Sequence, residues 1–378
     1  MAGGQLAQAV RHLNLQQVRK AVVATSLPAR RLSSSFALPY SSAIADTSRW
    51  GVREVGNYSP VSVEFGQTMT STDYDQQAMV VTIENGDGTF RNRHAFDGDR
   101  RVLYESNFPF GELPVALERL EDVEETFDNV AYLSNTWVDN FYHWLLLTAP
   151  MLNHYERAGI ELDHVYVGAP LKDWQVETLS FLGLRPEQVI TRPCRAKNAH
   201  VAILTRYVAG IPPEQINWLR SRFVINEPEP GHRRLFVGRG SNATTRKMID
   251  EQEIAERLER EFGFEYVSTA GMTLAEEREL FSQAEAVVGP YGAALTNILF
   301  APRGTKVLEL QAFDNDHRIN RCYQEMSAAF GNPHGFLRGQ PTARKRQGSN
   351  SDISVPEDEV VRAVDSMLSH ATPDRLAG

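Results

Sequence analysis

The segment from Val287 to Asn297 combines a short apolar strand, a turn of small residues and the start of a helix. Gly289, Gly292 and Ala293 leave the backbone unobstructed where the strand passes into the helix. The first N–H groups of a helix have no partner inside it, and together with the helix dipole they attract phosphate. The segment therefore predicts a phosphate-binding turn, and the alternative is a plain strand-to-helix turn without a ligand. A nicotinamide dehydrogenase is not favoured, because the pattern is not Gly-x-Gly-x-x-Gly.

A basic segment from Gly231 to Ile249 contains five formal positive charges and no acidic residue, although the whole chain has a formal net charge of −9. Arg239 comes just after a predicted strand, and Arg246 and Lys247 follow across a loop rich in Gly, Ser, Asn and Thr. Guanidinium groups placed in this way are suited to bind a diphosphate. The alternative is that the arginines pair with the acidic residues of the next predicted helix, which we expect for the first two arginines of the segment.

Glu309 ends the strand that follows the glycine turn. A carboxylate at the carboxyl end of such a strand can accept hydrogen bonds from ribose hydroxyls. Together with the arginines and the turn, Glu309 predicts a pocket for a nucleoside diphosphate. We assign to the donor side of this pocket Arg239, Arg246, Lys247, Gly289, Tyr291, Gly292, Ala293, Asn297 and Glu309.

The first half of the chain offers a second group of polar side chains, at the start of a predicted apolar helix. His143 is the candidate general base for an acceptor hydroxyl, because the usual pKa of histidine lies near neutral pH. Asp139 is the alternative base, and a purely structural role for the histidine is the other interpretation. To the acceptor side we assign its neighbours Asn140, Tyr142 and Trp144.

Short apolar strands and helical stretches alternate over most of the chain, which is typical of parallel α/β layers. The pattern predicts strands at 130–133, 164–167, 189–190, 234–237, 265–268, 286–288 and 306–310. It predicts helices at 140–158, 173–182, 250–261, 274–284 and from about 293.

The length of 378 residues favours two α/β domains, which we expect to be Rossmann-like with a cleft between them. An N-terminal β or irregular extension is expected to precede them, and short strands at 61–65 and 78–83 predict an antiparallel β element there. We expect an N-terminal helix and irregular arm at 1–59, an acceptor-side domain at 60–226, a Rossmann-like nucleotide-sugar domain at 227–340, and a linker with a terminal helix at 341–378. The boundary at 226 falls in a segment rich in Pro and Glu.

The composition excludes several classes of protein. A net charge of −9 opposes binding to nucleic acid, and no run approaches the roughly 18 to 20 apolar residues of a membrane span. The two cysteines, Cys194 and Cys322, do not suggest a disulfide framework, and residues 1–30 lack the apolar core of a secretory signal. We therefore expect a cytoplasmic protein with buried free thiols; peripheral contact with the inner membrane and a homodimer stay open.

Three blocks of this sequence resemble the signature blocks of glycosyltransferase family 61, in the same order and spacing. They are Asn140-Phe-Tyr-His-Trp-Leu-Leu, Arg234-Leu-Phe-Val-Gly-Arg239 with Arg246 and Glu251, and Val288-Gly-Pro-Tyr-Gly-Ala-Ala-Leu-Thr-Asn297 with Val307-Leu-Glu-Leu310. The resemblance implies a GT-B fold, a nucleotide-sugar donor that is usually a UDP-sugar, and inverting transfer to a hydroxyl. Family members include xylosyl-, arabinosyl- and O-linked N-acetylglucosaminyltransferases, and bacterial relatives associated with capsule or surface polysaccharide.

Two residues depart from the family's pattern. Tyr291 stands where the family usually has histidine, and Leu147 stands where the first block usually has an acidic residue. These departures motivate a second hypothesis, a non-catalytic nucleotide-sugar-binding scaffold of the same fold. A third is another phosphate-handling Rossmann enzyme.

Asp-x-Asp, a metal-binding pattern of many GT-A enzymes, occurs at 73–75, 97–99 and 314–316. A pattern this short carries little information. Because arginines and a helix start can neutralise a leaving diphosphate, we expect no metal or other cofactor. The expected partners are a nucleotide-sugar donor and a glycan or other hydroxyl acceptor.

Overall fold

The computed structural model describes residues 40–41, 51–58, 76–84, 86, 88–91, 93–98, 102–103, 123, 125–135, 137–204, 212–240, 243, 246–311, 322–341 and 352–369. The predicted N-terminal helix, the predicted strand at 61–65 and most of the predicted linker after residue 341 lie outside these ranges. Within them the chain divides into two compact units. Of the described residues, unit 1 comprises those within 40–58, 76–139 and 147–204, and unit 2 comprises those within 140–146 and 212–369.

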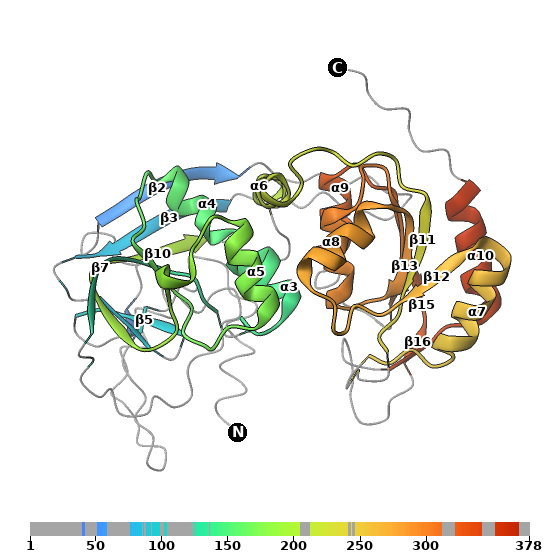
Figure 1. The fold of residues 1–378 in the computed structure, drawn as a ribbon, viewed down its shortest axis with the longest axis horizontal. Coiled ribbons are helices and arrows are strands. Elements are labelled where there is room, and N and C mark those ends of the chain that lie inside the picture. Colours follow the sequence, from blue (N-terminus) through green and yellow to red (C-terminus); the bar gives the residue numbers. More distant parts are fainter. Residues whose placement is uncertain are drawn as a thin grey trace, which may run out of the picture. The chain divides into compact units, whose positions relative to one another are not determined.

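Unit 1 is built on a ten-stranded sheet in which α4 (Met151–Arg157) contacts β3 and β10 (Figure 1). Its strands are β1 (Tyr40–Ser41), β2 (Gly51–Tyr58), β3 (Gln76–Ile83), β4 (Gly88–Arg91), β5 (His94–Phe96), β6 (Val102–Leu103), β7 (Thr126–Tyr132), β8 (His164–Tyr166), β9 (Val189–Ile190) and β10 (Cys194–Leu204). The neighbours β10, β7, β8 and β9 run parallel, whereas β3 and β4 both run antiparallel to β10.

The predicted α/β class is confirmed, but unit 1 departs from an all-parallel Rossmann-like sheet. The reason is the long strand β10, which pairs with β7 on one edge and with β3 and β4 in succession on the other. The arm expected to be irregular up to residue 59 also needs correction, because β2 in that region pairs with β3.

The predicted helix at 140–158 occurs as three pieces. They are α3 (Phe141–His143), the π-helical η3 (Trp144–Thr148) and α4. Pro150 precedes the third piece and has no N–H to continue the helical hydrogen bonds. In the core of unit 1, the hydroxyl of Tyr155 on α4 donates to the carbonyl of Tyr132 on β7 at 2.7 Å. The other helices of unit 1 are α5 (Asp173–Phe181) and η4 (Pro186–Gln188).

Unit 2 contains a five-stranded parallel sheet with the strand order β12-β11-β13-β14-β15. The strands are β11 (Arg233–Val237), β12 (Phe264–Val267), β13 (Ala284–Pro290), β14 (Lys306–Gln311) and β15 (His334–Arg338). Numbered within the unit, this is the doubly wound order 2-1-3-4-5. In such sheets ligands bind at the carboxyl ends of the two strands where the order reverses, here β11 and β13. The Rossmann-like prediction is confirmed for this sheet.

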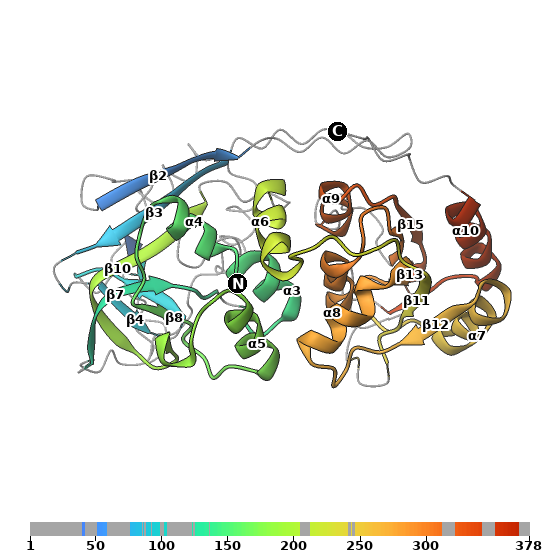
Figure 2. The same ribbon diagram turned by 45° about the horizontal axis from the view of Figure 1, so that its top comes forward.

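Helices cover both faces of the sheet of unit 2. Figure 2 shows α7 (Glu251–Phe262) and α10 (Glu357–Ser369) on one face, and α8 (Leu274–Ser282) and α9 (Cys322–Ala329) on the other. In α7, Ile254, Ala255 and Leu258 follow helical spacing and are buried against the sheet. Gly263 ends α7 with a positive φ of 70°, which a residue without a side chain adopts at low cost. A short hairpin of β16 (Gln340–Pro341) and β17 (Ile353–Ser354) precedes α10.

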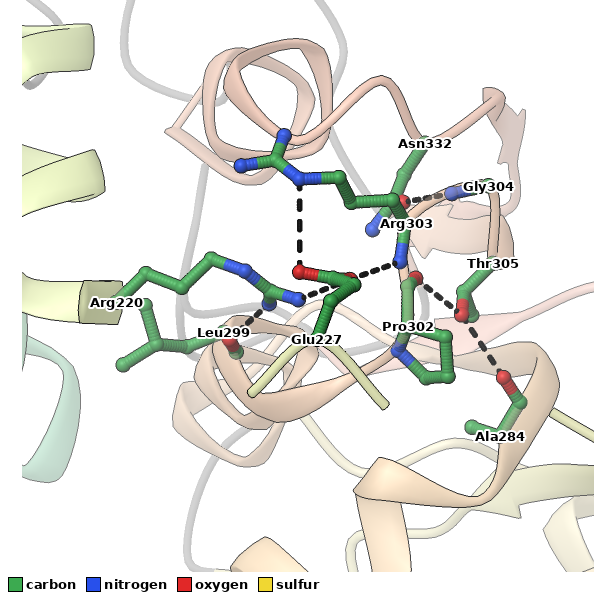
Figure 3. Close-up of polar contacts among 9 residues, drawn as sticks. All are labelled: Arg220, Glu227, Ala284, Leu299, Pro302, Arg303, Gly304, Thr305 and Asn332. Atoms are coloured by element: carbon green, nitrogen blue, oxygen red, sulfur yellow. Dashed lines mark hydrogen bonds and ion pairs between the residues drawn. The ribbon is translucent and has the colours of Figure 1, made fainter. Parts of the chain in front are cut away.

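The segment rich in Pro and Glu at the predicted boundary near residue 226 belongs to unit 2, which also includes α6 (Pro213–Phe223). The carboxylate of Glu227 accepts hydrogen bonds from Nη2 of Arg220 at 2.7 Å and from the backbone N of Arg303 at 2.8 Å (Figure 3). The guanidinium of Arg220 also donates to the carbonyl of Leu299 at 2.5 Å. Glu227 therefore joins α6 to the loop before β14.

Two predictions from composition can be compared with the structure. Cys194 and Cys322 are both buried free thiols, as predicted. No helix among the described residues combines the length and the apolar character needed to cross a bilayer.

Candidate functional site

The candidate site lies in unit 2, where β11 and β13 end beside each other. Arg239 follows β11, and its Nη1 donates a hydrogen bond to the carbonyl of Tyr291, which follows β13, at 3.1 Å. A Cβ atom on Gly292 would lie only 2.1 Å from the same Nη1. The absence of a side chain at Gly292 therefore lets the guanidinium of Arg239 lie against the turn.

Gly289 has a different packing role. A Cβ atom at this position would lie 2.6 Å from the carbonyl oxygen of Val237, so Gly289 allows β13 to approach β11 closely. The two glycines explain why the turn has an open backbone: one makes room for a neighbouring strand and the other for an arginine.

The predicted helix after the turn is a 3₁₀ helix, η5 (Ala293–Phe300). The N–H of Leu295 donates to the carbonyl of Gly292 at 3.0 Å, so the N–H groups of Ala293 and Ala294 precede the first helical hydrogen bond. Asn297 lies one 3₁₀ turn after Ala294 and is fully buried, and neither polar atom of its side chain has a hydrogen-bond partner among the described residues. Burying an unpaired amide is costly, so Asn297 is a candidate ligand contact.

Arg246 is the second arginine of the site, and its Cζ lies 5.1 Å from the centroid of the Tyr291 ring. This is the geometry of a cation–π contact. Burial lowers the pKa of Arg239, and the charge of Arg246 lowers it further, so the two guanidinium groups lie close enough to repel. Nε of each arginine is buried and has no hydrogen-bond partner in the part of the chain that the structure describes. Among the described residues, neither guanidinium forms an ion pair with a carboxylate. A bound anion would supply the missing negative charge.

The neighbouring acidic residues form ion pairs or hydrogen bonds with other groups. Arg233 pairs with Glu265 on β12 and Arg234 with Glu285 on β13. The first two arginines therefore form ion pairs, but their partners are not the acidic residues of the next helix, which the sequence predicted. Glu251, the first residue of α7, instead binds the backbone of the loop. Its carboxylate accepts hydrogen bonds from the N–H groups of residues 239 and 240 at 3.0 to 3.2 Å, and from the hydroxyl of Tyr266 at 2.8 Å. Glu251 therefore positions Arg239 without neutralising its side chain.

His143 belongs to unit 2 with the two arginines, because α3 contacts η5. The side chain of Asn140 caps α3 and accepts a hydrogen bond from the N–H of His143 at 3.3 Å. The ring of Tyr142 packs edge-on against Tyr323, with centroids 5.6 Å apart. Burial, and then the charge of Arg246, lower the pKa of His143 to about 4. His143 is therefore neutral near pH 7 and able to accept a proton.

Asp139 and Trp144, the other base and an acceptor-side residue of the prediction, make contacts that do not suit these roles. The carboxylate of Asp139 pairs with Arg93 of unit 1 at 2.5 Å, and the carbonyl of Asp139 accepts a hydrogen bond from Nζ of Lys172 at 2.8 Å. His143 is thus the better placed of the two predicted bases. Trp144, assigned to the acceptor side, is fully buried and has no surface to offer an acceptor in this structure. The turn of η3 directs its indole into the core.

Glu309 lies within β14 and is fully buried. Its Oε2 is 3.2 Å from Nε2 of His334, whose Nδ1 is 2.8 Å from the hydroxyl of Ser327. No described residue forms a hydrogen bond with Oε1. The carboxylate is not exposed, so a ribose could reach it only after neighbouring side chains move. Lys247 is exposed, and its backbone is bound to the C-terminal part of the chain.

Sequence reasoning missed Tyr323, whose hydroxyl donates to the carbonyl of Gly292 at 2.7 Å. Arg239 binds the carbonyl of Tyr291 and Tyr323 binds the carbonyl of Gly292, so two side chains hold consecutive carbonyls of the turn. It lies on α9, a helix that was not predicted. The spacing of Tyr323, Met326 and Phe330, all buried, is the helical signal that could have revealed it.

No group of three His, Cys, Asp or Glu side chains in the described part of the chain is placed to hold a metal ion. Each of the three Asp-x-Asp patterns lies wholly or partly outside that part. The absence of a metal requirement therefore stays a prediction.

Two comparisons with known proteins bear on the site. A search of curated proteins gives no match. Residues 141–308 match the family model described as Glycosyltransferase 61. The match begins at α3 and ends in β14, so it contains His143, both arginines and the glycine turn. On this match, residues 141–308 are similar to glycosyltransferase family 61.

Proposed function

We propose that this protein is a glycosyltransferase that uses a nucleoside-diphosphate sugar, in particular a UDP-sugar, and transfers the sugar to an acceptor hydroxyl with inversion. The observation that carries the proposal is the pair of guanidinium groups, Arg239 and Arg246, beside the turn at Tyr291 and Gly292. Both lack a carboxylate partner among the described residues. Guanidinium groups form charge-assisted, often bidentate, hydrogen bonds with phosphate oxygens.

In the proposed reaction the two arginines, with the N–H groups of Ala293 and Ala294, stabilise the negative charge that develops on the leaving diphosphate. Preorganised donors of this kind are a main source of catalytic power, and they make a metal ion dispensable. Neutral His143 accepts the proton of the acceptor hydroxyl as the oxygen attacks the anomeric carbon. One displacement of this kind inverts the anomeric configuration.

We further propose that the two units form a GT-B arrangement, with unit 2 as the donor-binding domain. The doubly wound order of its sheet supports the donor role, since such sheets bind nucleotides where the strand order reverses. For the acceptor we propose a glycan in surface or capsular polysaccharide synthesis, on the resemblance to bacterial members of the family. The cytoplasm is the proposed compartment.

The test is a thermal-shift titration with UDP, GDP, CDP and ADP. We expect UDP to raise the melting temperature of the wild type, and Arg239→Ala and Arg246→Ala to abolish the shift. Arg260→Ala is the matched control, because Arg260 is an exposed residue on α7. No shift with any nucleotide would refute the proposed donor class.

A transfer assay then separates an enzyme from a scaffold. We expect His143→Ala to bind UDP like the wild type and to lose sugar transfer to an acceptor extract. NMR of the product gives the anomeric configuration, and activity in the presence of EDTA tests the metal independence. UDP binding without turnover of any UDP-sugar would favour the scaffold.

A further inference from the structure

The C-terminal part of the chain returns to the loop that carries Arg246. The N–H of Lys247 donates to Oδ1 of Asp352 at 2.8 Å. The N–H of Ile353 donates to the carbonyl of Lys247, and the N–H of Ile249 donates to the carbonyl of Ile353, both at 2.8 Å. Three hydrogen bonds therefore attach the residues after Arg246 to a segment more than a hundred positions later.

Next to these hydrogen bonds, apolar side chains of both segments are buried in the hydrophobic core of unit 2. Met248 forms a parallel bridge with Ile353, and both side chains are buried in the cluster between the sheet and α10. The cluster also includes Val355 and Val360. The returning segment is therefore fixed by its apolar side chains, while the carboxylate of Asp352 is bonded to the loop.

The loop needs such support for two reasons. Arg246 has a φ of 55° and Asp250 a φ of 62°, a left-handed conformation that is unfavourable for residues with side chains. Arg246 also lies near the like charge of Arg239, which pushes the two guanidinium groups apart. An unsupported loop would relax away from the turn at Tyr291.

We propose that Asp352 is a positioning residue for donor binding, and that it holds Arg246 over Tyr291 by anchoring the backbone of Lys247. The inference rests on the proposed function. It extends the site to a segment outside the residues that match the family model, which end at 308. Asp352 acts through Lys247 and Arg246 and does not itself contact the substrate.

The charge of Asp352 gives the proposal a sharp test. Burial and the charge of Arg246 lower the pKa of Arg239, and the carboxylate of Asp352 is close enough to oppose this lowering slightly. A negative charge there opposes the binding of a diphosphate, whereas the hydrogen bond to Lys247 favours it. Asp352→Asn keeps an Oδ1 acceptor and loses the charge, and Asp352→Ala loses both. We therefore expect Asp352→Asn to bind UDP at least as tightly as the wild type, and Asp352→Ala to bind it about tenfold more weakly, in line with the loss of one hydrogen bond.

The experiment is calorimetric titration of the full chain with UDP, together with limited digestion by trypsin. The matched control is Asp358→Ala, which removes the same charge from α10 and leaves the loop untouched, since Asp358 pairs with Arg257. We expect Asp352→Ala alone to be cleaved faster after Lys247. Weaker UDP binding by Asp352→Ala alone supports the proposal. Unchanged or tighter binding by Asp352→Ala, or equally weakened binding by Asp352→Asn, overturns it. Absence of UDP binding by the wild type overturns the proposed donor and this inference together.

Discussion

The replacement of Gly292 by alanine should weaken donor binding while leaving the fold intact. The backbone at Gly292 has φ −179° and ψ 163°, an extended conformation that alanine adopts freely. The added Cβ would lie 2.1 Å from Nη1 and 3.3 Å from Cζ of Arg239, and 3.6 Å from the carbonyl oxygen of Pro290. The severe conflict is thus with the end of a flexible side chain, which can swing away.

The size of the effect follows from this distance. Non-bonded heavy atoms rest about 3.5 Å apart, so Nη1 of Arg239 must move by roughly 1.4 Å. That movement breaks its 3.1 Å hydrogen bond to Tyr291 and withdraws the guanidinium from the turn. A hydrogen bond to a charged group contributes about 1.5 to 3 kcal/mol. We therefore expect Gly292→Ala to bind UDP about 10- to 150-fold more weakly.

Calorimetric titration with UDP measures the affinity, and urea denaturation measures the free energy of unfolding. The control is Gly335→Ala on β15, where the new Cβ would make an ordinary 3.6 Å contact with Leu308. Gly335→Ala should stay within about 1 kcal/mol of wild-type stability. Gly292→Ala should lose no more than the about 1.5 to 3 kcal/mol of the broken hydrogen bond between Arg239 and Tyr291.

The decisive measurement is a double-mutant cycle with Arg239→Ala. If Gly292→Ala acts by displacing the guanidinium, it has no further effect once the guanidinium is gone. Equal weakening of UDP binding in the presence and absence of Arg239 would refute the reasoning.

Three further predictions follow from other contacts. Tyr291→Leu should weaken UDP binding about fivefold and Tyr291→Phe much less, because phenylalanine keeps the ring face that attracts Arg246; equal affinities of the two variants would contradict this. Burial lowers the pKa of His154 to about 4 from a usual 6.5, so the unfolded chain binds a proton first and stability falls as the pH drops through this window. Between pH 7 and pH 4.5, the free energy of unfolding of His154→Gln, measured by urea denaturation, should fall by about 2 to 3 kcal/mol less than that of the wild type. An equal fall in both proteins would argue against a neutral His154. Glu227→Ala should destabilise unit 2 by about 2 kcal/mol, because it leaves the buried guanidinium of Arg220 without its carboxylate. In urea denaturation, the double variant Glu227→Ala/Arg220→Met should lose less stability than Glu227→Ala alone.

Local sequence patterns predicted the elements of unit 2 well. The strand at 234–237 corresponds to β11 and the helix at 250–261 to α7, because buried strands and amphipathic helices carry their periodicity in neighbouring residues. The glycine turn was also recognised locally, from its run of small residues. All of these features can be read from residues that are neighbours in the sequence.

Contacts between distant segments could not be predicted in this way. Asp352 binds Lys247 across 105 positions, and Tyr323 binds Gly292 across 31. Nothing in the residues around Asp352 indicates that its carboxylate anchors an arginine-bearing loop. The burial of Glu309 was missed because the end of a strand in sequence does not reveal which helices cover it, here α9 with Ser327.

The basicity of His143 should depend on whether a donor is bound. In the ligand-free site, burial and then the charge of Arg246 lower the pKa of His143 to about 4, which makes it a weak base. A diphosphate bound to Arg246 offsets that positive charge, and a nearby anion favours the protonated imidazole. The pKa of His143 should therefore rise toward its usual 6.5 when UDP binds. NMR titration of the histidine ring, with His143→Gln to assign the signal, measures this shift. An upward shift in the wild type that Arg246→Ala abolishes would mean that the base gains strength only when a donor is present, so the leaving group and the proton acceptor are coupled through one arginine. A pKa of His143 that stays near 4 with UDP bound would show that the leaving group and the proton acceptor are not coupled.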